Sequence, residues 1–149
     1  MKTFLISVLM TTFFAGVAHA EIKRIAITAV FVNDFEAAKK WYTEKLGFKL
    51  VEDRVFGEGP GDRWISVSAK DDPQFRIVFK LGTPVTHQKY RPEAREAILT
   101  VFTDDLEKTA SELKARGVTF VMEPEHHPWA FEAMIQDQDG QGIVIAEMK

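Results

Sequence analysis

Hydrophobic and polar residues alternate along most of this chain, and the alternation is interrupted by two helical patterns. Apolar residues at every second position are typical of half-buried strands, whereas intervals of three or four are typical of helices. The first helical stretch follows Asp34 and ends near Gly47. The second follows Asp105 and ends near Gly117. The predicted strands that flank them are 24–32, 48–56, 63–69, 75–80, 97–102, 118–122, 131–136 and 142–147.

The two helical stretches belong to an internal repeat. Residues 30–36 (VFVNDFE) resemble residues 101–107 (VFTDDLE), and each segment leads into a helix. Asp34 and Asp105 are candidate N-caps, because a carboxylate before the first turn accepts hydrogen bonds from free backbone N–H groups. The glycines after both helices fall where a chain leaves a helix in the left-handed conformation. Each half therefore has the order strand, helix, strand, strand, strand.

Two such halves predict an α+β fold in which two βαβββ modules form a cupped mixed sheet around a cavity. We expect the modules at residues 21–82 and 96–149, joined by an extended linker at 83–95 that contains Pro84 and Pro92. One face of the strands packs on the helices, and the other lines the cavity. The repeat leaves open whether that cavity forms within one chain or between two.

The first twenty residues have the pattern of a cleavable signal peptide. Lys2 gives a positive start, residues 4–17 are apolar, and Ala18-His19-Ala20 is a small-x-small cleavage site. The apolar stretch is shorter than the roughly 20 residues of a membrane-spanning helix. We therefore expect export to the periplasm or the medium, with a mature domain at 21–149 that has no membrane attachment. An uncleaved anchor is the alternative.

Composition narrows the class of protein. The chain has no cysteine, so an exported domain must rely on a hydrophobic core instead of disulfides. Hydrophobic residues make up 46% of the chain, with twelve Phe and three Trp, which is ample for that core. Loss of Lys2 lowers the basic count from 19 to 18 against 22 acidic residues, a formal charge of −4. This mild acidity argues against a nucleic-acid partner, which requires a basic face.

The order, spacing and duplication of these features resemble the vicinal oxygen chelate superfamily, also called the glyoxalase/bleomycin-resistance/dioxygenase superfamily. The segments that carry the resemblance are 32–34, 41–48, 104–106, 116–118 and 137–140. The resemblance covers nearly the whole mature chain. It implies that enzymes of this kind hold a divalent metal with four residues, usually His, Glu or Gln, on four strands. The metal polarises vicinal oxygens while a carboxylate moves a proton.

The four metal positions, carried over residue by residue, hold no metal ligands in this chain. They fall at Ile27, at Arg76 or Ile77, at Ile98 or Leu99, and at Val144. The sequence does not fix the register of the second position. Aliphatic side chains have no lone pair, and a guanidinium repels a cation. The resemblance, with these substitutions, therefore predicts an apolar cavity without a cofactor.

Strand alternation places polar and aromatic side chains beside these positions. Trp64 shares a strand face with Ser66, and Thr100 shares one with Phe102. Hydroxyl groups in an apolar cavity orient a ligand, whereas aromatic rings belong either to the cavity or to the core. The candidate ligand-binding residues are Ile27, Trp64, Ser66, Ile77, Phe79, Ile98, Thr100, Phe102, Trp129 and Val144. Arg63 and Arg76 either meet an anionic ligand or lie on a solvated strand face.

A displaced divalent-metal site is an alternative. Glu123, His126 and His127 lie close together in a stretch that we predict to be a loop. Adjacent residues of an extended chain point to opposite sides, which makes the two histidines a poor chelating pair. Solvated loop histidines are the simpler interpretation.

Three functions fit the sequence. The first is an exported, metal-free protein that binds a small, partly apolar or aromatic molecule, as the bleomycin-resistance branch sequesters its ligand. The second is a divergent metal-dependent lyase or dioxygenase with displaced ligands. The third is an interaction protein with a filled cavity. A homodimer is compatible with each, and neither a nucleophile beside a base nor a phosphate-binding glycine loop suggests other chemistry.

Overall fold

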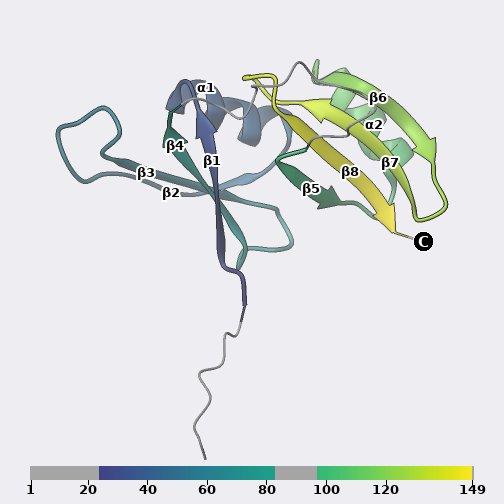
Figure 1. Ribbon diagram of the computed structural model, residues 1–149, viewed down its shortest axis with the longest axis horizontal. Coiled ribbons are helices and arrows are strands. Elements are labelled where there is room, and N and C mark those ends of the chain that lie inside the picture. Colours follow the sequence, from purple (N-terminus) through teal and green to yellow (C-terminus); the bar gives the residue numbers. More distant parts are fainter. Residues whose placement is uncertain (1–23, 83–96, 149) are drawn as a thin grey trace, which may run out of the picture.

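The computed structural model describes residues 24–82 and 97–148, which form two βαβββ modules (Figure 1). The elements of the first are β1 (Ile27–Val32), α1 (Phe35–Lys40), a π-helical turn η1 (Trp41–Lys45), β2 (Lys49–Val55), β3 (Arg63–Ser68) and β4 (Arg76–Leu81). Those of the second are β5 (Leu99–Phe102), α2 (Leu106–Ala115), β6 (Thr119–His126), β7 (Ala130–Gln136) and β8 (Gly142–Met148). The predicted signal peptide and linker lie outside the described residues.

Each module forms one four-stranded mixed sheet. The strand order is β1-β4-β3-β2 in sheet A and β5-β8-β7-β6 in sheet B. In both sheets the first strand of the module runs parallel to the last, and the other neighbours are antiparallel. In Figure 1 helix α2 lies behind sheet B, so one face of that sheet is left uncovered by the helix. We call the face away from the helix the outer face of each sheet. The predicted α+β fold of two βαβββ modules is confirmed.

Local sequence explains where the helices begin. The Asp34 carboxylate accepts a hydrogen bond from the Ala37 N–H at 2.6 Å, and the Asp105 carboxylate accepts one from the Lys108 N–H at 2.9 Å. Both predicted N-caps are confirmed, and each satisfies a backbone donor that the first turn leaves free. Within residues 24–82 and 97–148, no helix combines the length and apolarity needed to span a bilayer.

The C-terminal ends of the two helical segments meet across the molecule. The Lys45 ammonium donates to the Arg116 carbonyl, and the Arg116 guanidinium donates to the Lys45 carbonyl, with Nη1 and O 3.1 Å apart. Gly47 (φ +84°) and Gly117 (φ +74°) then turn the chain away in the left-handed conformation. Each helix end, where carbonyls carry partial negative charge, is thus capped by a cation from the other module.

One hydrophobic core joins the modules. Its buried side chains come from both sheets and both helices, and they include Phe79 from the first module and Leu106 and Ile135 from the second. Tyr42 is fully buried, and its hydroxyl donates to the Asp137 carboxylate in the β7–β8 turn at 3.3 Å. Burial raises the pKa of Tyr42 and also that of Asp137. The phenol therefore stays protonated at neutral pH and remains a donor.

Strand β6 is longer than the sequence predicted. The expected loop is wrong for residues 123–126, because β6 continues to His126, which pairs with Phe131 of β7, and only His127 lies beyond the strand. The longer strand contains Pro124, which is tolerated because β6 is an edge strand of sheet B. Register shifts on both sides of Met122 also break the strict alternation that identifies a strand in a sequence.

Candidate functional site

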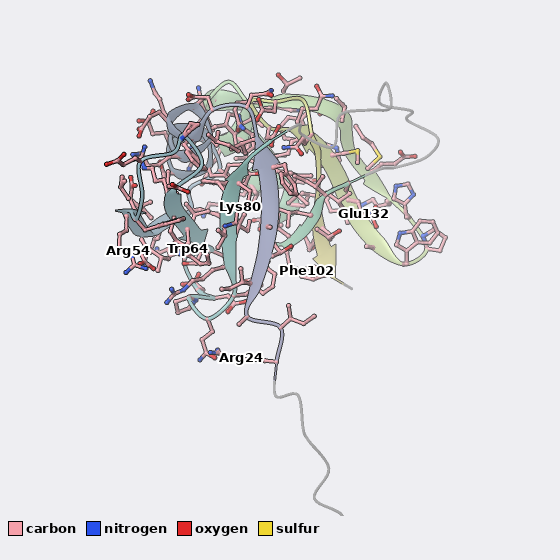
Figure 2. The ribbon with its side chains drawn as sticks, turned by 60° about the vertical axis from the view of Figure 1, so that its left-hand side comes forward. Arg24, Arg54, Trp64, Lys80, Phe102 and Glu132 are labelled. Atoms are coloured by element: carbon pink, nitrogen blue, oxygen red, sulfur yellow. The ribbon has the colours of Figure 1, made fainter. Side chains whose placement is uncertain are left out.

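The outer face of sheet A brings together several residues that the sequence singled out. Ile27 of β1 pairs with Arg76 of β4. Trp64 and Ser66 project from the outer face of β3, because the residues between and beyond them point into the core. The Lys80 ammonium lies 5.0 Å from the centre of the Trp64 ring, a cation–π contact (Figure 2). Sequence reasoning missed Lys80, although alternation from Arg76 places both on one face.

Ser66 places a buried hydroxyl on this face without a hydrogen bond to any described residue that would satisfy it. Its side chain is fully buried, and its hydroxyl has no hydrogen-bond partner in the described part of the chain. Its neighbours across the sheet are Val78 on β4 and Glu52 on β2. An unsatisfied buried hydroxyl costs about 1–3 kcal/mol. The group is therefore a candidate to bind a ligand atom.

The outer face of sheet B holds a second set of predicted residues. Thr100 of β5 pairs with Val144 of β8, which in turn pairs with Met134 of β7. Phe102 shares the face of Thr100 and is 67% exposed (Figure 2). Ile98 lies just before β5, where it is half-buried and packs against the common core. Thr100 places a hydroxyl on the edge strand of this face, beside the apolar Val144 and Met134.

Two predicted site residues lie on the opposite side of sheet A. Ile77 and Phe79 are buried in the core, where the Phe79 ring lies 5.0 Å from that of Tyr42, measured between centroids. The pairing of Ile27 with Arg76 also fixes the register that the sequence left open. Arg76, and not Ile77, is the residue of β4 beside Ile27 on the outer face.

Trp129 lies at the turn between β6 and β7. Its ring is 60% exposed and stacks on that of His127, with centroids 5.3 Å apart. Its indole Nε1 donates a hydrogen bond to the Glu132 carboxylate at 2.7 Å. The hairpin thus holds this exposed aromatic ring in place through a stacking contact and a hydrogen bond.

The residues of the alternative metal site are not brought together. Glu123 forms an ion pair with Lys114, whereas His126 stacks on Phe131 with centroids 4.0 Å apart. His127 is stacked on the tryptophan of the hairpin instead. In the part of the chain that the structure describes, no cluster of three or more His, Cys, Asp or Glu is arranged to hold a metal ion.

A groove of about 770 Å³ lies between the modules, where the β3–β4 turn approaches β5 and α2. Thr100 and Phe102 line it from the second module, and Phe48, Phe75 and Ile77 line it from the first. Ile77 is therefore the one member of the buried pair on β4 that also borders this space. The groove connects the predicted residues of sheet B with the core side of sheet A.

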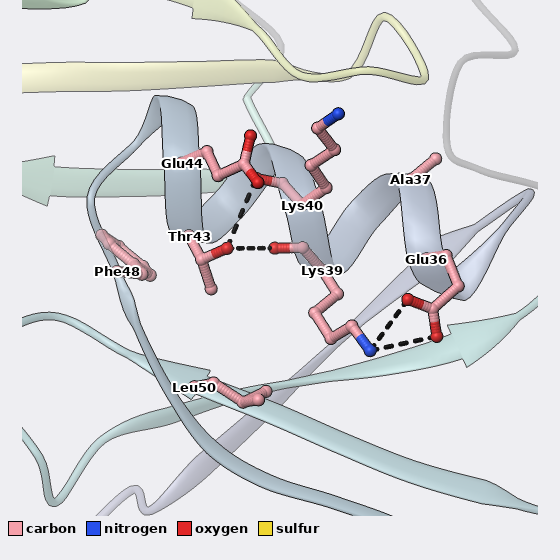
Figure 3. Close-up of a pocket in the computed structure, with 8 residues that line it drawn as sticks. All are labelled: Glu36, Ala37, Lys39, Lys40, Thr43, Glu44, Phe48 and Leu50. Atoms are coloured by element: carbon pink, nitrogen blue, oxygen red, sulfur yellow. Dashed lines mark hydrogen bonds and ion pairs between the residues drawn. The ribbon is translucent and has the colours of Figure 1, made fainter.

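A second groove, of about 650 Å³, lies between α1 and β2 on the helix side of sheet A (Figure 3). Lys39 lines it and is bound to Glu36 and to Asp53, each at 2.8 Å. Arg63 bridges the same two carboxylates, each at 2.7 Å. The hydrogen bond from Arg63, supported by that from Lys39, lowers the pKa of Asp53 to about 2. These charges satisfy one another, so Arg63 is not available to an anionic ligand.

Comparison with known proteins identifies the family. The family model described as the Glyoxalase/Bleomycin resistance protein/Dioxygenase superfamily matches residues 24–145, a span that contains both modules. The chain belongs to this superfamily.

Two relatives in Bacillus subtilis (strain 168) have no characterised function. YurT is 32% identical over 134 residues, covering 83% of this chain and 98% of YurT. YetH is 29% identical over 126 residues, covering 85% of this chain and 99% of YetH. Among solved structures, TnmS3 is described as an antibiotic binding protein from Streptomyces sp. CB03234. It is 29% identical, with a TM-score of 0.71 over 88% of this chain and 100% of its own.

The side chains at this superfamily member's expected metal positions do not fit a divalent ion. Ile27 and Arg76 stand side by side on sheet A, and Val144 pairs with Thr100 on sheet B. Leu99, one option for the third position, pairs with Ile143 and packs on the core. Divalent ions require several nitrogen, oxygen or sulfur donors, and a single neutral hydroxyl does not supply them.

Proposed function

We propose that this superfamily member binds a small, partly apolar or aromatic molecule against the outer faces of its sheets, without a metal ion. The observation that carries the proposal is the chemistry at the expected metal positions, where Ile27, Arg76 and Val144 replace donors. TnmS3, a relative at 29% identity, is described as an antibiotic binding protein, which supports binding as the role carried over.

The outer faces offer the groups that such a ligand requires. Trp64 and Phe102 supply aromatic surface, and aromatic contacts contribute about 0.5–1.5 kcal/mol beyond the area that they bury. Ser66 and Thr100 supply hydroxyls that orient a ligand among apolar neighbours. Oriented hydrogen bonds within apolar surroundings give specificity without turnover.

Metal analysis combined with a ligand screen tests the proposal. Residues 21–149 are purified, exposed to Zn²⁺, Mn²⁺ and Fe²⁺, dialysed, and analysed for bound metal by mass spectrometry. We expect no stoichiometric metal, and a rise in Tm with aromatic ligands that a chelator does not change. A ligand at one hundred times its Kd stabilises the folded state by about 2.7 kcal/mol, which gives a shift of several degrees. Stoichiometric metal, with lyase or dioxygenase turnover that a chelator abolishes, would establish the alternative instead.

We also propose that the protein is exported after cleavage behind Ala20. The positive start, the apolar stretch and the small-x-small site at residues 1–20 support this. Intact mass measurement on the periplasmic fraction of the native host should give a chain that begins at Glu21. A cytoplasmic protein that retains residues 1–20 contradicts export but leaves ligand binding untouched.

A homodimer that buries the first strands is the third part of the proposal. Ile27 and Phe31 on β1 are 46% and 44% exposed, and Phe102 on β5 is more exposed still. Large apolar side chains exposed on an outer face are characteristic of interfaces or ligand sites. Light scattering should give twice the chain mass for wild type and the chain mass for Phe102→Asp. A wild-type monomer at tens of micromolar excludes the dimer.

A further inference from the structure

The register of sheet A defines a map of its outer face in three rows that run from β1 to β2. The first row is Phe31, Lys80, Trp64 and Arg54. The second row is Ala29, Val78, Ser66 and Glu52. The third row starts with Ile27 and Arg76 and ends with Ser68 and Lys49. Small side chains therefore occupy the middle of the face, where Val78, Ser66 and Ser68 are buried, and long or aromatic side chains surround them.

This surround is strongly basic in a chain whose formal charge is negative. It contains four cations, Lys49, Arg54, Arg76 and Lys80, against the single carboxylate of Glu52. Arg54 pairs with Glu52 at 3.4 Å. Lys49 and Arg76 form no ion pair with any residue that the structure describes, and Lys80 lies over the Trp64 ring. Excess positive charge gathered on one face attracts an anion.

The equivalent face of sheet B has the opposite character. Its four strands contain no Lys or Arg. The row through its centre is Thr100, Val144, Met134 and Met122. The basic surround of sheet A is therefore not a by-product of the duplicated fold, because the second copy of the fold lacks it.

Each group on the outer face of sheet A matches one part of an aromatic acid. The Arg76 guanidinium has the planar geometry that pairs with a carboxylate through two hydrogen bonds. The Trp64 ring offers a stacking surface, and in the free protein Lys80 occupies the position above it. The Ser66 hydroxyl has no partner among the described residues and is fully buried, so it can donate to a ligand only once the side chains that cover it move aside.

We propose that the outer face of sheet A binds an aromatic carboxylate, with its ring on Trp64 and its carboxylate between Arg76 and Lys80. On binding, the Lys80 ammonium moves off the indole face and pairs with the carboxylate. The ring of the ligand takes its place. This assignment rests on the proposed small-molecule binding and specifies the class of ligand and the face that holds it.

The test uses three probes that share a naphthalene ring and differ in charge, so that the contribution of charge to binding is measured apart from that of the ring. They are 2-naphthoate, the neutral 2-naphthamide and the cationic 2-naphthylmethylammonium. Calorimetry on residues 21–149 in low salt should show 2-naphthoate binding about tenfold more tightly than the amide. The cation should not bind measurably. Raising the salt concentration should weaken the binding of 2-naphthoate and leave the binding of 2-naphthamide unchanged.

Variants locate the site. Arg76→Met and Lys80→Met keep an apolar stem. Each should lower the affinity for 2-naphthoate roughly tenfold and leave the affinity for 2-naphthamide unchanged. Trp64→Leu should lower the affinity for both probes to the same extent. Lys108→Met, on the exposed surface of α2, is the matched control and should change neither. Circular dichroism checks that each variant is folded, and the two charge variants test the same prediction independently.

The outcomes separate this inference from the function on which it rests. Equal affinity for 2-naphthoate and 2-naphthamide overturns the inference alone. So does an affinity for 2-naphthoate that is unchanged in both Arg76→Met and Lys80→Met. So does a screen in which other aromatic compounds raise the Tm while 2-naphthoate does not bind. If no compound in either experiment binds, the small-molecule function fails as well.

Discussion

At the residue scale, Asp53 couples helix α1 to sheet A through charge. Its carboxylate accepts hydrogen bonds from Lys39 at 2.8 Å and from Arg63 at 2.7 Å, while its side chain is 21% exposed. These partners lower its pKa from 3.8 to about 2, chiefly through Arg63. Because the folded-state pKa lies below the unfolded one, the stabilisation is complete above about pH 5 and is lost towards pH 2.

Asp53→Asn should therefore destabilise the protein in a pH-dependent way. Solvent screening limits the cost to about 1 kcal/mol of unfolding free energy at pH 7. The difference from wild type should shrink as the pH falls from 5 to 2, because wild type loses the same charge contacts. Urea unfolding at pH 7, 4, 3 and 2 measures this, with Asp71→Asn on the exposed surface as the control. A cost that stays constant across this range would show that the charge contacts contribute nothing.

Residue-level predictions succeeded where they needed only the local period of a strand. Trp64 and Ser66 share a face because they lie two apart, and no distant contact is required to know it. The choice between Arg76 and Ile77 needed the pairing of β4 with β1, which joins segments far apart in sequence. A one-residue shift in that register moves a side chain from the outer face to the core.

At the scale of elements, both helical segments end on a glycine in the left-handed region. A Cβ at Gly47 would lie 3.3 Å from Arg116 Nη1, and one at Gly117 would lie 3.5 Å from Lys45 Nζ. The unfavourable φ dominates at both positions, since these contacts are with the flexible ends of long side chains.

Gly47→Ala and Gly117→Ala should each lower the unfolding free energy by about 1–2 kcal/mol. Gly61→Ala is the control, because its added Cβ meets nothing within 4 Å and its φ is not positive. That variant should stay within about 0.5 kcal/mol of wild type. Denaturant unfolding measures all three, and equal effects at Gly47 and Gly61 would remove the conformational explanation.

The elements themselves were predictable to the extent that their signals are local. A capping aspartate and a terminal glycine act within a few residues, so the sequence located both helices. The full length of β6 depends on partners in β7 and on its place at the sheet edge, where Pro124 costs no ladder hydrogen bond. Neither condition is written in the segment itself.

At the scale of the whole molecule, the modules are joined at more than their core. Lys45 and Arg116, 71 residues apart, cap each other's helix ends. Elsewhere the Asn33 side-chain amide donates to the Asp139 carboxylate at 2.7 Å, and the Gln141 amide donates to the Phe31 carbonyl at 3.1 Å. The duplication was visible in the sequence, but these contacts between the modules were not, because each pairs residues from different repeats.

The shared core predicts that both modules unfold in one transition, since the buried cluster contains side chains from each. The tryptophans allow a direct test. Variants in which Trp41 and one other are changed to Phe retain either Trp64 in the first module or Trp129 in the second. Both carry the Trp41 change, so each is a matched control for the other. Fluorescence and circular dichroism should give coincident urea midpoints for both variants. If the Trp64 signal is lost at one urea concentration and the Trp129 signal at another, the modules are separate folding units, and the contacts between them do not couple their unfolding.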